Sequence, residues 1–259
     1  MTGCPICEGE RKEHFRAEIL GKYPVSYLYC SACGLMQTEE PYWLDEAYGS
    51  AIAAPDTGLI QRNLYLSRAL ACILYFLFDR NGKYLDIAGG YGLLTRLMRD
   101  IGFDYYWTDR YCENLFARGF EVSEGGGPFT AVTAFEVLEH VHDPLSFLRQ
   151  CLSGYGTRSI IFTTELFEGI PPLPGDWYYY AFGTGQHISF YQSGTLSFLA
   201  KKLGLSLQSN RSIHMMTERP CNPGVFKVMT GRLSGVVIAY VRRNMRSRTF
   251  SDFERLIQS

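Results

Sequence analysis

The sequence lacks an uncharged hydrophobic run long enough to cross a bilayer, which takes roughly 20 residues. Its longest apolar tract, "GVFKVMTGRLSGVVIAYV" from Gly224, is interrupted by Lys227 and Arg232. It also lacks a basic and then apolar leader at its N-terminus, which reads "MTGCPICEGERKEHF". These absences predict a cytoplasmic protein without a transmembrane segment.

The sequence also lacks an excess of charge of either sign. Its 25 Lys and Arg residues and 26 Asp and Glu residues give a net charge of −1, which provides no global field to attract nucleic acid. With 259 residues, 46% of them hydrophobic, the chain can bury one sizeable core and a small appendage. We therefore expect one main domain and no nucleic-acid partner.

One segment departs from this balance of charge. From Val225 to Phe250 the chain carries basic side chains and no acidic one. We interpret residues 231–259 as a basic C-terminal tail that is solvated by default. Weak contact with an anionic membrane surface, or binding of a sugar-nucleotide diphosphate, is the alternative.

Cysteine is sparse outside one pattern. Four of the eight cysteines form two CxxC pairs, Cys4 with Cys7 and Cys30 with Cys33. Four thiolates on two such turns complete the tetrahedral ligand set of a structural Zn²⁺ ion, with no open position for catalysis. Two disulfides or four unused thiols are the alternative, which a cytoplasmic chain disfavours. Residues 1–42 are therefore predicted to form a zinc-binding ribbon.

The hydrophobic periodicity changes after the ribbon. Leucine and isoleucine recur at helical spacings between Asp56 and Asp79, which predicts helices in a linker over residues 43–80. From Lys83 to Thr164, short apolar bursts alternate with helical stretches, the rhythm of βαβ units around a parallel sheet. The aromatic tract after Glu165 is much longer than an ordinary connection, so we place the substrate there.

The first strand of that sheet ends in "KYLDIAGGYG", where Asp86 precedes Gly89, Gly90 and Gly92. The segment lacks the Gly-Lys-Ser/Thr of a phosphate-binding loop, and its glycine spacing does not match the dinucleotide fingerprint. A carboxylate here would also repel a pyrophosphate. It suits S-adenosylmethionine, which carries an ammonium and a sulfonium and needs the close backbone approach that glycine permits.

A second carboxylate supports this interpretation. The next predicted strand, "FDYYWTD", ends in Asp109. An acid at this position can accept the ribose hydroxyls, by the geometry that dinucleotide folds use at the end of their second strand. We expect Asp109 to act on the ligand alone, so its loss should barely change the stability of the apo protein.

At these residues the sequence resembles the class I S-adenosylmethionine-dependent methyltransferases. Their first motif is Asp-x-Gly-x-Gly-x-Gly, and this chain has Asp86-Ile87-Ala88-Gly89-Gly90-Tyr91-Gly92. Ala88 replaces the first glycine, and its methyl group fits if the residue has a negative φ. The fourth-strand motif is matched by "VTAFEVLEHVHDP", from Val132 to Pro144.

This resemblance implies an α/β, Rossmann-like methyltransferase sheet of seven strands over residues 81–230. It also implies S-adenosylmethionine as the cofactor. The cofactor-binding residues that it implies are Asp86, Ala88, Gly89, Gly90, Gly92, Asp109, Arg110, Phe135 and Glu136.

A narrower resemblance is to the sugar C-methyltransferases, which act on nucleotide-activated deoxysugars. "CPIC", followed by "YPVSYLYCSACGLMQT", resembles their N-terminal zinc-binding module. Their Glu-His pair and aromatic-serine run correspond to Gln186-His187-Ile188-Ser189-Phe190-Tyr191, with Gln186 in place of glutamate. The resemblance implies that His187 is the general base and that Tyr48 lines the sugar pocket. His140 is a further candidate base.

We therefore expect methyl transfer to a nucleotide-activated sugar or another surface-glycan or secondary-metabolite precursor. O-methylation of another small molecule is the alternative within the enzyme class. A non-catalytic adaptor, whose ribbon binds a partner and whose methyltransferase fold senses the cofactor, is the alternative outside it. Glu136, Glu139 and His140 would share one helical face. We interpret them as shaping the cofactor pocket, with Mg²⁺ binding as the alternative.

Overall fold

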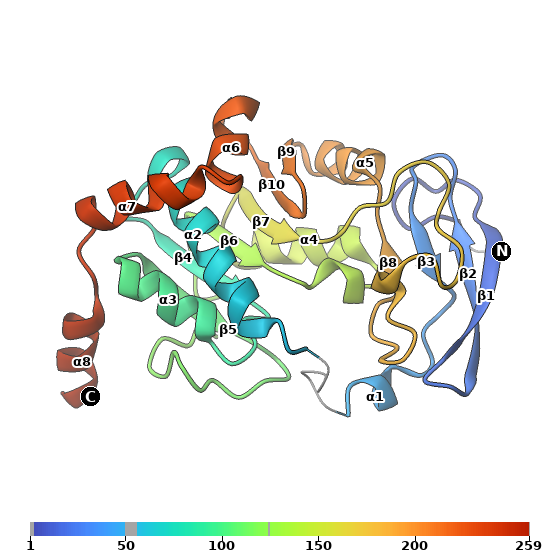
Figure 1. Cartoon of the computed structure of the whole chain (residues 1–259), viewed down its shortest axis with the longest axis horizontal. Coiled ribbons are helices and arrows are strands. Elements are labelled where there is room, and N and C mark those ends of the chain that lie inside the picture. The colour runs from blue at the N-terminus through green and yellow to red at the C-terminus, as the bar shows by residue number, and fades with distance from the viewer. Residues whose placement is uncertain (1–2, 50–55, 124, 259) are drawn as a thin grey trace.

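The computed structural model describes residues 3–49, 56–123 and 125–258, which form two sheets along the long axis of the molecule (Figure 1). The N-terminal sheet contains the antiparallel strands β1 (Lys12–Ile19), β2 (Tyr23–Tyr29) and β3 (Met36–Thr38). Its fourth strand, β8 (Ser189–Phe190), comes from far along the chain and pairs with β3. The short helix α1 (Leu44–Ala47) follows β3.

Aromatic side chains form the core of this N-terminal lobe. Phe15 and Tyr27 stack with their ring centroids 4.6 Å apart, and Tyr180 meets Phe190 edge to face at 4.9 Å. Large buried rings dominate the energetics of such cores. Part of the aromatic tract that the sequence assigned to the substrate therefore builds the lobe itself.

The larger sheet has the strand order β5-β4-β6-β7-β10-β9. Strands β5, β4, β6 and β7 are parallel, whereas β10 runs antiparallel to both of its neighbours. In chain order the strands are β4 (Lys83–Ile87), β5 (Asp104–Thr108), β6 (Ala131–Ala134), β7 (Ser159–Thr163), β9 (Ser206–Asn210) and β10 (Ile213–Thr217).

Helices cover both faces of this sheet, because successive side chains along a strand point to opposite faces. On β4, Tyr84 points to one face and packs in a core with side chains from four helices. Its neighbour Leu85 points to the other face and packs in a second core, with side chains from two further helices. The first face carries α2 (Leu59–Leu77), α3 (Leu93–Ile101), α6 (Pro223–Thr230) and α7 (Ser234–Asn244), and the second carries α4 (Pro144–Gly154) and α5 (Ser193–Leu203). Ile6 and Leu35 of the N-terminal lobe join the second core, so the lobe packs directly on the main domain.

The main sheet has six strands among the described residues, where the sequence predicted seven. Beyond β5 there is an isolated bridge between Trp107 and Glu121 in place of a strand. Val122 N–H donates to the Trp107 carbonyl at 2.9 Å. Glycines lie on both sides of this bridge, at position 119 and at positions 125–127. Glycine weakens a strand because it has no side chain to pack.

The segment predicted as a basic tail forms α7 and then α8 (Thr249–Ile257). Asp252 anchors α8, because its carboxylate accepts hydrogen bonds from Arg99 Nη2 at 2.6 Å and Arg96 Nη2 at 2.9 Å. No single helix among the described residues is long and apolar enough to cross a membrane. Helices α6 and α7 are long and apolar enough only when they are taken together, and the chain bends by 87° between them.

Candidate active site

A cleft of about 740 Å³ lies at the C-terminal ends of the parallel strands. Asp86, Ala88, Gly89 and Gly90, in the turn after β4, form part of its lining. The segment between β7 and α5 supplies another part, including His187. Ligands of open α/β sheets bind at this edge. The predicted cofactor side and the predicted base therefore share one cleft.

Asp86, at the end of β4, is 3% exposed. Thr133 Oγ1 donates to Asp86 Oδ1 at 2.7 Å. A Cβ on Gly89 would lie 2.9 Å from Asp86 Oδ2 and 2.7 Å from Trp107 Cδ1, so only glycine fits there. Burial raises the pKa of Asp86 to about 7, to which the charge of Asp109 adds. A cationic ligand would favour the ionised carboxyl.

Ala88 departs from the prediction made for it. Its φ is +54°, in the left-handed region, so the condition of a negative φ is not met. The chain turns sharply between β4 and α3, and Gly90 and Gly92 are also left-handed, with φ of +55° and +82°. This conformation costs an L-residue roughly 1–2 kcal/mol. The backbone at Ala88 is therefore strained, whereas the nearby left-handed positions of the same turn are glycines.

Asp109 hydrogen-bonds two segments of backbone together. Its Oδ2 accepts from Gly90 N–H at 2.8 Å, and its Oδ1 accepts from Tyr111 N–H at 2.7 Å and Cys112 N–H at 2.8 Å. The carboxylate thereby links the glycine-rich turn to the loop after β5. The expectation that Asp109 acts on the ligand alone is therefore wrong, because these bonds also hold the apo structure.

His187 and His140 both line the cleft, and both use Nδ1 for a hydrogen bond to the backbone. Nδ1–H of His187 donates to the Tyr179 carbonyl at 2.6 Å, and Nδ1–H of His140 donates to the Gln186 carbonyl at 3.0 Å. Each bond fixes the tautomer in which Nε2 has the lone pair. Burial lowers the pKa of both rings, that of His140 to about 3. The rings lie 4.9 Å apart, edge to face, and are neutral at pH 7.

Tyr48, directly after α1, also lines the cleft. Its ring stacks on that of Tyr111 at 5.6 Å and lies 6.2 Å from that of His140. Burial raises the pKa of the Tyr48 hydroxyl. The hydroxyl is therefore a hydrogen-bond donor for a bound acceptor rather than a base.

The family model described as a methyltransferase domain matches residues 60–210. The chain belongs to this methyltransferase family. The matched range begins in α2, ends with β9 and contains the cleft residues from Asp86 to His187. Residues 1–42, which the sequence predicts to be a zinc-binding ribbon, lie outside it.

Two curated relatives resemble part of the methyltransferase domain. Ubiquinone biosynthesis O-methyltransferase of Caulobacter vibrioides is 32% identical over 123 residues, which cover 37% of this chain and 49% of that protein. The protein of the same name from Caulobacter sp. strain K31 is 36% identical over 101 residues, which cover 29% and 40%. The chain thus spans half or less of the length of these relatives. Among solved structures, TnmH has a TM-score of 0.46 at 20% identity, over 68% of this chain and 60% of that one.

Other predicted cofactor residues of the methyltransferase domain differ in placement. Phe135 and Glu136 line the cleft. Arg110 is exposed, with its guanidinium 5.8 Å from the centre of the Tyr111 ring. Sequence reasoning missed Arg62, which lines the cleft from α2 and pairs with Asp56 at 2.7 Å. It was missed because the apolar spacing of α2 indicates only core packing.

Glu139, His140 and His187 bring three potential metal ligands within 4.8 Å of one another. Glu139 is fully buried, and its carboxylate oxygens have no hydrogen-bond partner among the described residues. Burial raises the pKa of Glu139 to about 8. The sequence grouped Glu136 with this face, but Glu136 Oε1 accepts from Thr163 Oγ1 at 2.6 Å instead. Imidazole and carboxylate groups can together hold a divalent cation. Without a cation, burial keeps Glu139 protonated and uncharged at pH 7.

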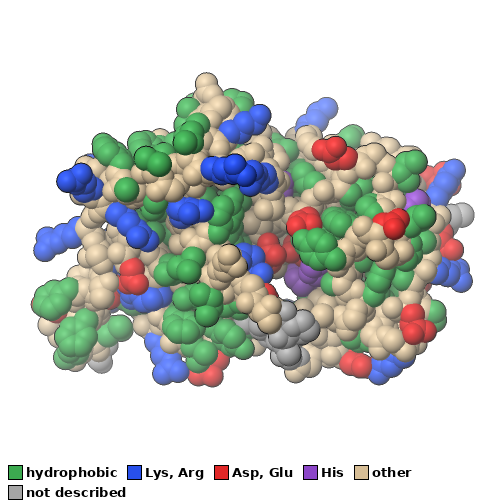
Figure 2. All heavy atoms as spheres, viewed as in Figure 1, with side chains coloured by type: hydrophobic (Ala, Val, Ile, Leu, Met, Phe, Trp, Pro, Cys, Tyr) green, Lys and Arg blue, Asp and Glu red, His purple; other side chains and the backbone are tan. Residues whose placement is uncertain are grey.

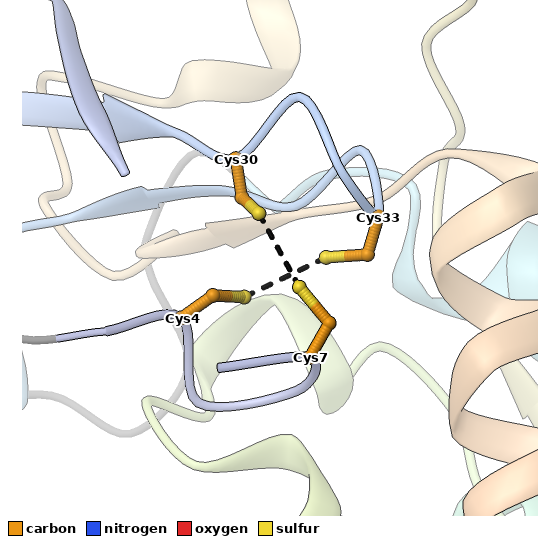
Figure 3. A group of neighbouring side chains, drawn as sticks. All are labelled: Cys4, Cys7, Cys30 and Cys33. Atoms are coloured by element: carbon orange, nitrogen blue, oxygen red, sulfur yellow. Dashed lines mark hydrogen bonds between the residues drawn. The ribbon is translucent and has the colours of Figure 1, made fainter. Parts of the chain in front are cut away.

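The four cysteines of the N-terminal lobe converge (Figure 3). Sγ of Cys4 lies 3.5 Å from Sγ of Cys33, Sγ of Cys7 lies 3.4 Å from Sγ of Cys30, and all four lie within 4.8 Å of one another. Disulfides need about 2.05 Å, so these distances do not fit them. Tetrahedral zinc, with bonds of about 2.3 Å, separates its sulfurs by roughly 3.8 Å. The four positions fit that ion.

Proposed function

We propose that the protein transfers a methyl group from S-adenosylmethionine to a small-molecule acceptor, with His187 as the general base. The observation that carries this proposal is the single cleft lined by Asp86, Asp109 and His187 in a chain of the methyltransferase family. When bound, S-adenosylmethionine supplies an electrophilic methyl group on its sulfonium.

The cofactor side of the cleft would bind the charged and ribose parts of the ligand. Asp86 would face positive charge, which favours its ionised form. Gly89 permits close approach, since a side chain there would collide with Asp86. Asp109 Oδ2 accepts one backbone N–H and so keeps a lone pair for a ribose hydroxyl.

The acceptor side of the cleft would remove a proton. His187 Nε2 would take it from a carbon beside a ketone or from a hydroxyl, while Nδ1–H remains bonded to the Tyr179 carbonyl. Tyr48, stacked on Tyr111, would donate a hydrogen bond to the acceptor. The same residues therefore serve either C- or O-methylation.

For the acceptor we favour a nucleotide-activated sugar or a related surface-glycan or secondary-metabolite precursor. Support comes from the cysteine pattern of residues 1–42, which resembles the N-terminal module of the sugar C-methyltransferases. Strand β3 of this segment also pairs with β8, which begins two residues after His187. O-methylation of another small molecule is the second candidate. It is favoured by the two relatives, both of which carry the name ubiquinone biosynthesis O-methyltransferase.

Methyl-labelled S-adenosylmethionine, offered with one panel of nucleotide ketosugars and one of phenolic hydroxyl acceptors, tests these alternatives. Label on a sugar carbon of the product, with solvent deuterium at the same carbon of the recovered substrate, would support the first candidate. Label on an oxygen would support the second. Absence of transfer to every acceptor, by protein that binds the cofactor, would contradict both.

Asp86 predicts a pH dependence of cofactor binding. Its pKa in the apo protein is about 7, so below that pH a cationic ligand must displace a proton from it. The affinity for S-adenosylmethionine should therefore rise about tenfold per pH unit below the pKa and level off above it. Calorimetric titration across this range measures the slope. Asp86→Asn should bind weakly at every pH, and a flat wild-type profile would reject the assignment.

Asp109→Ala should weaken both the apo protein and its binding of S-adenosylmethionine. Three backbone N–H groups lose their charged acceptor, so the free energy of unfolding should fall by about 1–3 kcal/mol. Binding should lose roughly 1.5–3 kcal/mol for one charge-assisted hydrogen bond. Denaturant unfolding and calorimetry measure the two effects. Glu113→Ala, on the exposed side of the same loop, is the control, and unchanged stability in the Asp109 variant would contradict the argument.

We also propose that Cys4, Cys7, Cys30 and Cys33 hold one structural Zn²⁺ ion. The sulfur positions support this, since they suit a tetrahedral ion and no S–S bond. Four thiolates leave no site for a substrate on the metal. The ion would fasten the loop before β1 to the turn between β2 and β3.

A further inference from the structure

The C-terminal helices carry large apolar side chains on the molecular surface. Leu233, Val236 and Phe250 are 59%, 73% and 70% exposed. Figure 2 shows such side chains over α7 and α8, with Lys and Arg side chains among them. We name this region the α6–α8 surface, and its exposed apolar residues are Val225, Val228, Leu233, Val236, Tyr240, Phe250, Phe253, Leu256 and Ile257.

The exposed residues of each helix share one face. Val236 and Tyr240 are one turn apart on α7, opposite Ile238 and Val241, which pack into the main core. On α8, Phe250, Phe253 and Ile257 recur at i, i+3 and i+7, on the side opposite Asp252. An amphipathic helix normally buries its one apolar stripe and exposes polar residues. Helices α7 and α8 each contact the protein through one face, and each exposes apolar side chains on the opposite face.

The charge around this surface has a single sign along a long segment. No acidic residue lies between Glu218 and Asp252, and Asp252 is paired with Arg96 and Arg99. The exposed basic residues of the segment are Arg219, Lys227, Arg232, Arg242, Arg243 and Arg246. Beyond Asp252, α8 carries one exposed acidic residue, Glu254, next to the exposed Arg255. Exposed aliphatic and aromatic residues bordered by cations are typical of helices that lie on an anionic lipid surface.

The geometry favours a contact in the plane of the membrane. Helices α6 and α7 have enough combined length and hydropathy for a span, but they meet at 87°. Phe226 and Val241 hold them in the main core, so neither can insert across a bilayer without unfolding it. A second copy fits the surface poorly, because a two-fold contact would place this basic surface against an identical basic surface.

We propose that the α6–α8 surface docks the protein on an anionic lipid bilayer, with the apolar residues at the acyl boundary and the arginines at the headgroups. Cosedimentation with lipid vesicles tests this and needs no methyl transfer. Vesicles of phosphatidylcholine with about a third phosphatidylglycerol should bind the protein, whereas pure phosphatidylcholine should not. High salt should release it, because it screens the headgroup charge.

Two variants assign the binding to this surface. Leu233→Asp with Val236→Asp should lower the partition coefficient at least about tenfold, and Arg242→Gln with Arg243→Gln should lower it about fivefold per residue. Phe198→Asp, on α5, replaces an exposed aromatic elsewhere and should bind as the wild type does. Thermal unfolding should be alike in all variants, since the changed side chains are exposed.

Three results would overturn the proposal. The first is a wild-type protein that does not sediment with anionic vesicles. The second is a double aspartate variant that sediments as the wild type does. The third is a dimer, seen by light scattering, that the same aspartates dissociate, because the surface would then belong to a second copy.

Discussion

His187→Asn should bind S-adenosylmethionine normally and lose ~10²–10⁴-fold in the rate of methyl transfer. An asparagine amide can still donate to the Tyr179 carbonyl, which His187 Nδ1 reaches at 2.6 Å, so the loop should keep its conformation. The change removes Nε2, the proton acceptor. Asp86 and Asp109 remain in place, so calorimetry should find the cofactor affinity unchanged while a labelled-methyl assay finds the rate lost.

Proton exchange separates the base from other roles of His187. If the acceptor is a ketosugar, the variant should also stop exchanging the proton beside the ketone with deuterated water, a step that needs the base but not the methyl group. His140→Asn is the matched control, because His140 Nδ1 also donates to a backbone carbonyl beside the cleft. If the His187 variant kept both transfer and exchange, His187 would have a structural role only, and His140 would become the candidate base.

The site residues whose placement follows from the sequence are those fixed by local chain geometry. Asp86 and Asp109 end neighbouring parallel strands, and such ends meet at one edge of the sheet. Each CxxC pair needs only its own turn to aim two sulfurs at one point. The α/β fold followed in the same way from the alternation of strand and helix patterns.

The parts that it did not predict depend on contacts between distant segments. Glu136, Glu139 and His140 were assigned to one helical face, but residues 138–140 form a single 3₁₀ turn, which has about three residues per turn. His187 therefore joins Glu139 and His140 where Glu136 was expected. The left-handed Ala88 was also unforeseen, because its φ depends on the turn that the whole sheet imposes.

The N-terminal lobe is hydrogen-bonded to the residues that follow the candidate base. Gln37, on β3, is fully buried, and its Nε2 donates to Ser189 Oγ at 3.0 Å. Thr38 N–H donates to the Ile188 carbonyl at 3.0 Å. The residues directly after His187 are thus held by the sheet that the cysteine cluster closes. No sequence pattern indicates this pairing, because β8 has two residues and lies far from β3 in the chain.

Cys30→Ser should remove the zinc, unfold the N-terminal lobe and greatly lower the rate of methyl transfer. Structural zinc supplies about 10–16 kcal/mol in zinc-finger peptides, whereas a whole domain is stable by only about 5–15 kcal/mol, so a small lobe should not survive the loss of a ligand. Metal analysis should give about one zinc per chain for wild-type protein and none for the variant. Cys221→Ser, outside the cluster, should keep both the zinc and the rate.

The cofactor affinity of the Cys30 variant distinguishes this mechanism from general unfolding. Asp86 and Asp109 follow strands of the main sheet, which has its own cores on both faces, so S-adenosylmethionine should still bind. The transfer rate should fall, because β8 loses its partner strand and His187 loses its support from the residues that follow it. Wild-type protein that contains no zinc when prepared without chelator would contradict the metal site. A zinc-free variant with an unchanged rate would show that the lobe does not position the base.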